Sequence, residues 1–422
     1  MRADIIVRNI GRLLTMSDGA IPRVGADMRK TGEIREAAVA ALDGVVVAAG
    51  PEADVTGEVA LGDGAVEVDA GGAVVTPGLV DPHTHAVFAR TRESEFAMRV
   101  EGRTYEEIAA EGGGIRSSVR AVREATEDDL VRGGRSTLDT MLSYGTTTAE
   151  VKSGYGLSLA SELKMLRAIA RLDGEHAVRL VPTFLGAHEF PDEWRDDRDG
   201  YVDEIVERMI PEVGAEGLAT FCDIFCEDGV FTVPQSRRVL TAARQAGMQL
   251  KLHADELHAF GAAELAAELG ARSADHLVCV SEGGVAALAA AGVAAVMLPG
   301  TSLSLGGTKY APARRLIDAG APVALATDCN PGSSMTESMQ IVMALASMVM
   351  RMTPDEALTG ATVNAAWACA AEAEAGTVEV GKPCDLVIWR VADHRAIPYH
   401  YGVNLVRTVI AGGQVVRDFD IS

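Results

Sequence analysis

Short apolar runs alternate with longer helix-like stretches through the middle of the chain, between residues 76 and 377. This alternation is typical of repeated βα units around a parallel sheet. Eight of the runs have the length of strands: Gly78–Asp81, Thr147–Lys152, Arg179–Leu185, Phe221–Phe225, Gln249–His253, Ser273–Leu277, Ala294–Leu298 and Val323–Thr327. Because eight strands close a TIM barrel, the pattern predicts an α/β fold built on a (β/α)8 barrel.

The two ends of the chain have a different pattern, with short β-type runs between turns rich in Gly and Asp. These runs are Asp4–Val7, Ala38–Ala48 and Ala65–Val68 near the start, and Asp385–Trp389, Val403–Ile410 and Gln414–Arg417 near the end. Neither end is large enough to bury a core alone. We therefore predict a small composite β-sandwich domain from residues 1–75 and 378–422, beside a barrel of residues 76–377.

The acidic composition limits the kinds of partner. The formal net charge is −22, and no cluster of Lys and Arg offers the basic stripe that nucleic acid requires. No apolar stretch of about 20 residues predicts a membrane span, and six cysteines in 422 residues do not resemble a disulfide framework. We expect a soluble cytoplasmic protein in which any anionic small-molecule substrate meets a local positive charge.

Five of the nine histidines lie at the C-terminal ends of predicted strands, where the catalytic groups of such barrels lie. His83 and His85 are two residues apart in an extended segment and can face one ion. A lone His-x-His is most often a surface feature, but His253 and Asp328 end other strands and complete a ligand set with an open position. The sequence predicts one divalent cation per chain, best matched by zinc.

Two further polar residues follow the same strands. Glu256, three residues after His253, is predicted to be the general acid/base, with a solvated loop carboxylate as the alternative. His276 is predicted to orient water or to stabilise an oxyanion, with a hydrogen-bonded core histidine as the alternative. The remaining histidines are expected at the surface without a role: His176, His258, His394 and His400.

Several segments resemble known families. The segment Pro77–His85 resembles the first-strand signature of the amidohydrolase superfamily. Within that superfamily, motifs over nearly the whole chain resemble those of the imidazolonepropionase family: Thr91–Phe96, Gly112–Ile115, Val151–Gly156, Phe184–His188 and Asp328–Gly332.

This resemblance implies the hydrolysis of 4-imidazolone-5-propanoate to N-formimidoyl-L-glutamate in histidine degradation, with zinc or iron as the metal. An activated water would attack the ring carbonyl carbon while Glu256 moves a proton to the departing ring nitrogen. Strand four ends without the lysine that bridges two ions in related barrels, so one ion is expected. The family's substrate-binding residues correspond to Arg92, Tyr155, His188, Asn330, Gly332 and Ser333, the last a serine where the family pattern has threonine.

Two other functions remain open at this stage. A deaminase acting on a purine, pyrimidine or related ring uses similar histidines but releases ammonia. A barrel that binds ligands without catalysis would lack the metal. A homodimer suits the predicted architecture.

Overall fold

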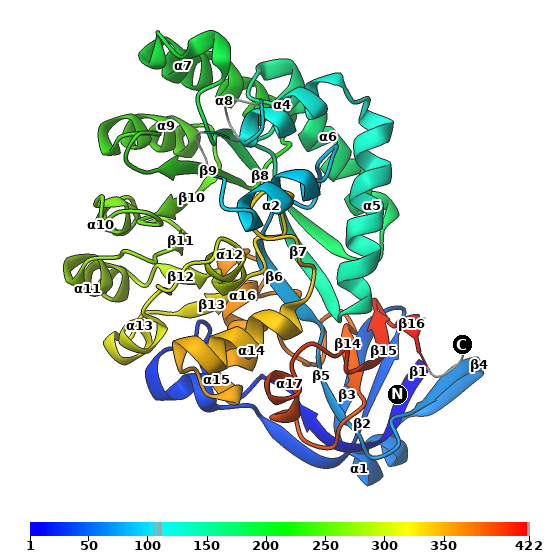
Figure 1. Cartoon of the computed structure of the whole chain (residues 1–422). Coiled ribbons are helices and arrows are strands. Elements are labelled where there is room, and N and C mark those ends of the chain that lie inside the picture. The colour runs from blue at the N-terminus through cyan, green and yellow to red at the C-terminus, as the bar shows by residue number, and fades with distance from the viewer. Residues whose placement is uncertain (104–106, 108–111, 420–422) are drawn as a thin grey trace.

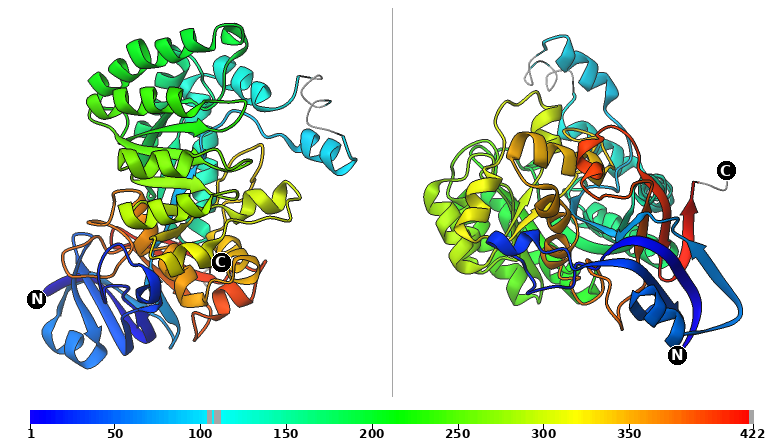
Figure 2. Two further views of the ribbon diagram at one scale, coloured as in Figure 1. Left: turned by 90° about the vertical axis from the view of Figure 1, so that its left-hand side faces the viewer. Right: turned by 90° about the horizontal axis from the view of Figure 1, so that it is seen from below.

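The structure is a computed structural model that describes residues 1–103, 107 and 112–419, and it contains two eight-stranded sheets (Figures 1 and 2). One sheet forms the barrel, and the other combines strands from both chain ends, which meet at one side of the barrel. Among the described residues, none of the helices has both the length and the apolar character needed to span a bilayer.

The barrel is the predicted parallel sheet, with its strands in chain order from β6 to β13. The strands are β6 (Leu79–Thr84), β7 (Thr146–Lys152), β8 (Arg179–Ala187), β9 (Phe221–Cys226), β10 (Gln249–Ala254), β11 (Ser273–His276), β12 (Ala294–Met297) and β13 (Val323–Leu325). The barrel closes where Thr84 bridges Cys329, just beyond β13. The predicted fold class is confirmed, and each strand lies where the sequence predicts it.

Helices follow the strands and cover the outside of the barrel (Figure 1). After β6 come α2 (Glu93–Val100), α4 (Ile115–Glu124) and α5 (Glu127–Ser143), and after β7 comes α6 (Leu159–Glu175). The next βα units contain α7 (Arg198–Glu204), α8 (Ile210–Glu216), α9 (Val233–Gln245), α10 (Ala262–Leu269) and α11 (Glu282–Ala291). The last are α12 (Pro299–Ser304), α13 (Ala313–Ala319), α14 (Met339–Met350), α15 (Pro354–Gly360) and α16 (Val363–Ala368).

The second sheet is mixed and is held together by its long first strand. Strand β1 (Arg2–Leu14) pairs antiparallel with β2 (Glu33–Leu42) and parallel with both β4 (Ala60–Asp69) and β5 (Val74–Pro77). Strand β3 (Val45–Pro51) follows β2, α1 (Glu52–Glu58) follows β3, and α17 (Ala396–Tyr399) lies between the strands of the other chain end. Those strands are β14 (Leu386–Trp389), β15 (Val406–Ala411) and β16 (Gln414–Asp418).

The run Ala38–Ala48, predicted as one β segment, is two strands joined by a tight turn. Asp43 and Gly44 have φ values of 51° and 81°, which suit a two-residue hairpin. Residues Asp and Gly at these positions tolerate positive φ, so the chain reverses inside an otherwise uniform apolar run. The predicted turn at Gly412-Gly413, with φ of 53° and 72°, joins β15 to β16.

Candidate active site

Three histidine side chains converge at the C-terminal end of the barrel strands. His83 lies on β6, His85 follows directly after it, and His253 lies on β10. One ring nitrogen from each lies within 4.8 Å of the others, and all three residues are buried. The structure thus brings together the three imidazoles predicted to share an ion.

Asp328 reaches the same place from the segment after β13. Its Oδ1 atom is 3.6 Å from Nε2 of His83 and 3.7 Å from Nε2 of His85. Its Oδ2 atom accepts a hydrogen bond of 2.6 Å from the Thr301 hydroxyl, which fixes the carboxylate and leaves Oδ1 directed at the histidines. Asp328 therefore lies where a fourth, oxygen ligand is needed.

The unpaired atoms of this cluster fit a cation. The His83 Nε2 and His253 Nε2 atoms are buried and have no hydrogen-bond partner among the described residues. Burial, and then the charge of Lys152, hold the pKa of His83 well below its usual range, so its ring is neutral. Buried neutral imidazole nitrogens without hydrogen bonds are costly unless they coordinate a metal. The residues present therefore fit a metal site.

A buried carboxylate lies behind each of two histidines, and the one behind His83 is hydrogen-bonded to its ring. Nδ1 of His83 lies 2.6 Å from Oδ2 of Asp275, and Nδ1 of His253 lies 3.0 Å from Oδ2 of Asp223. Lys152 connects the two, with Nζ 2.8 Å from Asp223 and 3.6 Å from Asp275. When Nδ1 carries the proton, Nε2 presents its lone pair, which is the form that ligates a metal.

Glu256 and His276 lie next to the histidine cluster. Oε1 of Glu256 is 3.6 Å from Nδ1 of His276, and the His276 ring centroid is 5.1 Å from that of His253. The Glu256 side chain is only 15% exposed. Burial raises its pKa to about 7, which is suited to taking up and releasing a proton near neutral pH. These surroundings differ from those of a solvated loop carboxylate.

His188 and Tyr155, named above by resemblance, lie on another side of the histidine cluster. The His188 ring stacks on that of His85 with 5.0 Å between centroids, and Tyr155 is 5.5 Å from each of them. Nδ1 of His188 lies 3.0 Å from the Gly154 carbonyl oxygen, which fixes that nitrogen as the donor. Burial lowers the pKa of His188 to about 3, so this ring is neutral.

The segment after Asp328 forms a tight loop around Asn330. The Asn330 Oδ1 accepts hydrogen bonds from the backbone N–H groups of Gly332 (2.7 Å) and Ser333 (2.8 Å). Its Nδ2 donates to the Asp328 carbonyl oxygen (2.7 Å) and to the Ser333 hydroxyl (2.9 Å). The Asn330 amide thus holds this loop in shape beside the candidate ligand.

Arg92 meets this loop from the opposite side. Its Nε and Nη2 donate to Oε2 of Glu95, at 3.0 and 2.6 Å. Its Nη1 is packed so closely that a Cβ atom on Gly332 would lie 2.4 Å from it. The absence of a side chain at Gly332 therefore lets the guanidinium approach the loop.

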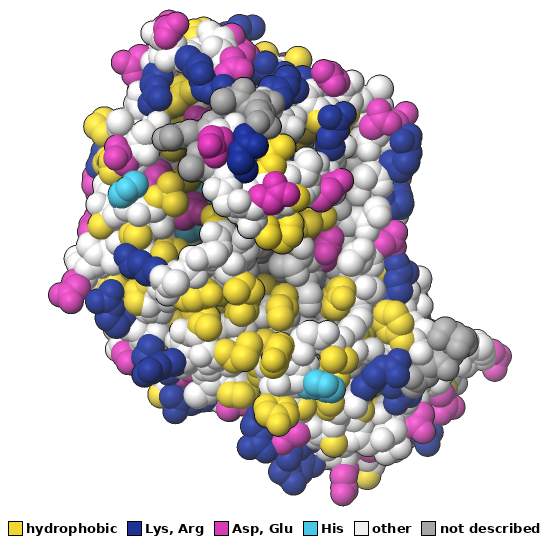
Figure 3. All heavy atoms as spheres, in the orientation of Figure 1, with side chains coloured by type: hydrophobic (Ala, Val, Ile, Leu, Met, Phe, Trp, Pro, Cys, Tyr) yellow, Lys and Arg dark blue, Asp and Glu magenta, His cyan; other side chains and the backbone are white. Residues whose placement is uncertain are grey.

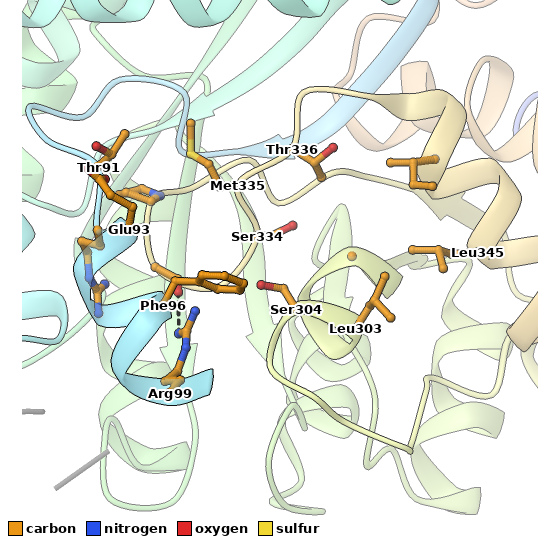
Figure 4. A pocket seen from close by; sticks show the side chains of 15 residues that line it. Thr91, Glu93, Phe96, Arg99, Leu303, Ser304, Ser334, Met335, Thr336 and Leu345 are labelled. Atoms are coloured by element: carbon orange, nitrogen blue, oxygen red, sulfur yellow. Dashed lines mark hydrogen bonds between the residues drawn. The ribbon is translucent and has the colours of Figure 1, made fainter. Parts of the chain in front are cut away.

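A cavity of about 510 Å³ opens beside these residues (Figure 4). Arg92, Phe96 and Arg99 line it from α2 and its start, and Leu303 and Ser304 line it from α12. The loop after β13 lines another side of the cavity with Pro331, Gly332, Ser334 and Met335. The three clustered histidines do not line this cavity, and its link to them along the chain is the loop that begins at Asp328 and continues into Pro331 and Gly332.

Backbone strain also occurs at the same strand ends. Asp255, His276 and Asp328 are not glycines, yet their φ values are 49°, 75° and 53°. Left-handed conformations of such residues cost free energy and persist where the surrounding structure imposes them, frequently at functional sites. Asp255 is held by its Oδ1, which accepts backbone N–H bonds from Phe260 and Gly261 at 2.8 and 3.1 Å.

Some polar residues near the site were not predicted. Asp223, Lys152 and Glu150 are fully buried inside the barrel, and Lys152 Nζ is 2.6 Å from Glu150 Oε1. Buried Glu227 accepts from the backbone N–H of Leu257 (2.9 Å) and so holds the turn after Glu256. The sequence does contain a signal for these buried charged residues: Glu150 and Lys152 are charged, lie two apart in an apolar strand and so point to the same side of it.

The prediction that four histidines lie at the surface is wrong for His394. Its side chain is 7% exposed, and its Nε2 lies 2.5 Å from Oδ1 of Asp355. Asp355 is in the first turn of α15, so a long-range contact that sequence spacing does not reveal buries the ring. The prediction is also wrong for His176, whose side chain is 6% exposed, whereas His258 and His400 are exposed, as predicted.

The barrel is parallel, and three buried imidazoles lie at its C-terminal rim together with the carboxylate of Asp328 and the guanidinium of Arg92. These features define a metal-dependent hydrolase of the amidohydrolase class. The sequence model of the amidohydrolase family matches residues 74–416.

Comparison with known proteins narrows the class. The chain is 47% identical to the imidazolonepropionase of Alkaliphilus metalliredigens, over 99% of both chains. It is 50% identical to the imidazolonepropionase of Symbiobacterium thermophilum, over 98% of this chain and 97% of the relative. The chain belongs to the amidohydrolase family and, within it, to the imidazolonepropionases.

Solved structures share the fold. Guanine deaminase of E. coli superimposes with a TM-score of 0.74 and 14% identity, over 98% of both chains. An adenosine deaminase of Xanthomonas campestris with bound zinc gives a TM-score of 0.70 and 21% identity, over 99% of this chain and 93% of the other.

Proposed function

We propose that the enzyme hydrolyses 4-imidazolone-5-propanoate to N-formimidoyl-L-glutamate, a step of histidine degradation. The relatives at 47–50% identity are imidazolonepropionases over nearly the full length, which supports this substrate. One structural observation carries the chemistry: the histidine cluster and the guanidinium of Arg92 lie on either side of one loop, Asp328–Ser333. The two ends of this loop thus contact the proposed metal ligands and the cation proposed for the propanoate.

In this proposal His83, His85, His253 and Asp328 hold one divalent cation, with zinc as the ion and iron as the alternative. Neutral imidazoles and a carboxylate oxygen are the donors that catalytic zinc takes. When bound, such an ion lowers the pKa of water at the site and polarises a carbonyl oxygen. Asp275, hydrogen-bonded to Nδ1 of His83, keeps that ring in the ligating tautomer, and the carboxylate of Asp223 lies beside Nδ1 of His253.

The protein residues then carry the proton and bind the substrate. Glu256 takes a proton from the attacking water and delivers it to the ring nitrogen as the C–N bond breaks. His276, neutral because burial lowers its pKa to about 4, donates a hydrogen bond to the developing oxyanion. His188 is neutral because burial lowers its pKa to about 3, and its single N–H is bonded to the Gly154 carbonyl, so its Nε2 accepts a hydrogen bond from a ring N–H of the substrate. Tyr155 closes the ring-binding side, and Arg92 with the loop of Asn330, Gly332 and Ser333 receives the propanoate.

The test is the loss of absorbance of freshly prepared imidazolone propanoate with metal-replete protein and with chelator-treated protein. We expect turnover only in the metal-replete sample, restored when zinc is added back. Product analysis should find N-formimidoylglutamate with both ring nitrogens retained. Release of ammonia would instead assign a deaminase, and no turnover by metal-replete protein would refute the proposal.

We further propose that the enzyme works as a homodimer. An apolar surface made by α12, the loop after β13, α14, α17 and the segment after it faces outward (Figure 3). It exposes large side chains: Leu303, Met335, Met348, Tyr399 and Tyr401, which are between 49% and 85% exposed. Contiguous apolar surface of this kind marks interfaces. Light scattering should give twice the mass of one chain, and Met348→Glu should shift the enzyme toward monomer; a monomeric wild type would contradict this.

A further inference from the structure

Two guanidinium groups approach the same backbone position from helix α2. Arg92, at the start of the helix, packs its Nη1 against Gly332. Arg99, two turns later, donates from Nη1 to the Gly332 carbonyl oxygen at 2.8 Å. Both line the cavity of Figure 4, where the dashed line marks the Arg99 hydrogen bond. The loop after β13 is thus contacted by two cations.

The two cations differ in their partners. Arg92 has its charge matched by Glu95, a buried carboxylate whose Oε2 accepts from both Nε and Nη2. Glu95 also accepts from the backbone N–H of Gly114 at 3.1 Å, so it is itself held in place. Arg99 is bonded to a neutral carbonyl, and no carboxylate of the described residues lies within 4.0 Å of its guanidinium.

The surroundings of Arg99 also disfavour its positive charge. The residue is half-buried. Burial first and the like charge of Arg92 second lower the pKa of its guanidinium below the usual value, and the charge of Glu95 offsets only part of this lowering. An arginine cannot release its proton near neutral pH, so an anion is what relieves this cost. Glu93 also lines the cavity, but it is exposed, and water and salt screen its charge.

We propose that Arg99 is a second substrate-binding residue, which supplies the unmatched positive charge for the substrate's propanoate while Arg92, tied to Glu95, sets the geometry. This inference rests on the proposed function. Together Arg92, Glu95 and Arg99 carry one net positive charge, equal and opposite to the single charge of the propanoate. In a chain with net charge −22, such a local excess is needed to hold an anion.

The experiment compares two substrates, imidazolone propanoate and its neutral propanamide, in wild type, Arg99→Met, Arg99→Gln and Arg99→Lys. For the propanoate we expect Arg99→Met and Arg99→Gln to raise KM about 10- to 100-fold with kcat changed less than about threefold, since a hydrogen bond to a charged group is lost. For the propanamide we expect little change. Arg99→Lys should restore most of the affinity because it restores the charge.

Arg198→Met is the matched control, because Arg198 also donates to a glycine carbonyl oxygen, that of Gly229, at the surface. It should leave both substrates unaffected. If the Arg99 variants impair both substrates equally, Arg99 only holds the loop and the inference is wrong. If wild type hydrolyses neither substrate, the proposed function has failed, an outcome visible before any variant is measured.

Discussion

Nδ1 of His83 and Oδ2 of Asp275 are 2.6 Å apart, and both residues are completely buried. Asp275 is held in turn by the Ser273 hydroxyl, which donates to its Oδ1 at 2.6 Å. The pair joins two strands far apart in sequence and determines which nitrogen of His83 faces the cluster. A carboxylate outside the histidine cluster therefore shapes the candidate metal site.

We predict that Asp275→Asn weakens metal binding about 10- to 100-fold while the protein still folds. A neutral amide holds the Nδ1–H of His83 less firmly than the ionised carboxylate does, so the ring is less well oriented to bind the ion. Competition with a chromophoric chelator measures this affinity directly. Asp318→Asn, at a 68% exposed side chain, is the control and should bind metal as wild type does. Equal affinities in both variants would show that Asp275 does not tune the ligand.

Glu256→Gln should retain the metal and lose most turnover, by about 100- to 10,000-fold in kcat, because the amide cannot accept the proton of the attacking water. Metal content and kcat are measured on the same preparation. Glu282→Gln, at a fully solvated glutamate at the start of α11, should behave as wild type. Near-normal kcat in Glu256→Gln would remove Glu256 from this role.

The rate should also depend on pH through the same carboxyl group. Burial raises the pKa of Glu256 to about 7, and the protonated form cannot act as a base. As the pH falls through this pKa, kcat/KM should decrease, about tenfold per pH unit at the limit. A bound divalent cation stabilises the ionised form of Glu256 and so lowers its pKa. In the metal-loaded enzyme, the decrease of kcat/KM at low pH should therefore be centred between the usual pKa of glutamate and about 7.

Metal content measured across the same pH range separates this titration from loss of the ion, because ligand protonation also weakens metal binding. A kcat/KM that stays level from pH 8 to pH 4.5 at constant metal content would contradict the assignment.

The sequence predicted the barrel because each strand is locally apolar and is followed by a helix. It also predicted that His83, His253 and Asp328 lie at strand ends, where the structure has them, and the C-terminal ends of barrel strands meet at one rim. The buried charged residues behind the histidines were not predicted. Lys152, Asp223 and Asp275 become neighbours only when β7, β9 and β11 close into a barrel. Side-chain spacing along one strand cannot specify contacts between strands.

The contact between Arg92 and Gly332 could not be predicted from the sequence either, because it joins segments 240 positions apart. Gly332→Ala should raise KM about tenfold with a smaller change in kcat, because the new Cβ would lie 2.4 Å from Nη1 of Arg92 and push the guanidinium away from its place. Gly174→Ala is the matched control, because a Cβ there meets nothing within 4 Å. Steady-state kinetics with measured metal content tests this. An unchanged KM in Gly332→Ala would mean that the guanidinium can move without loss, and that its packing against Gly332 does not position it for the propanoate.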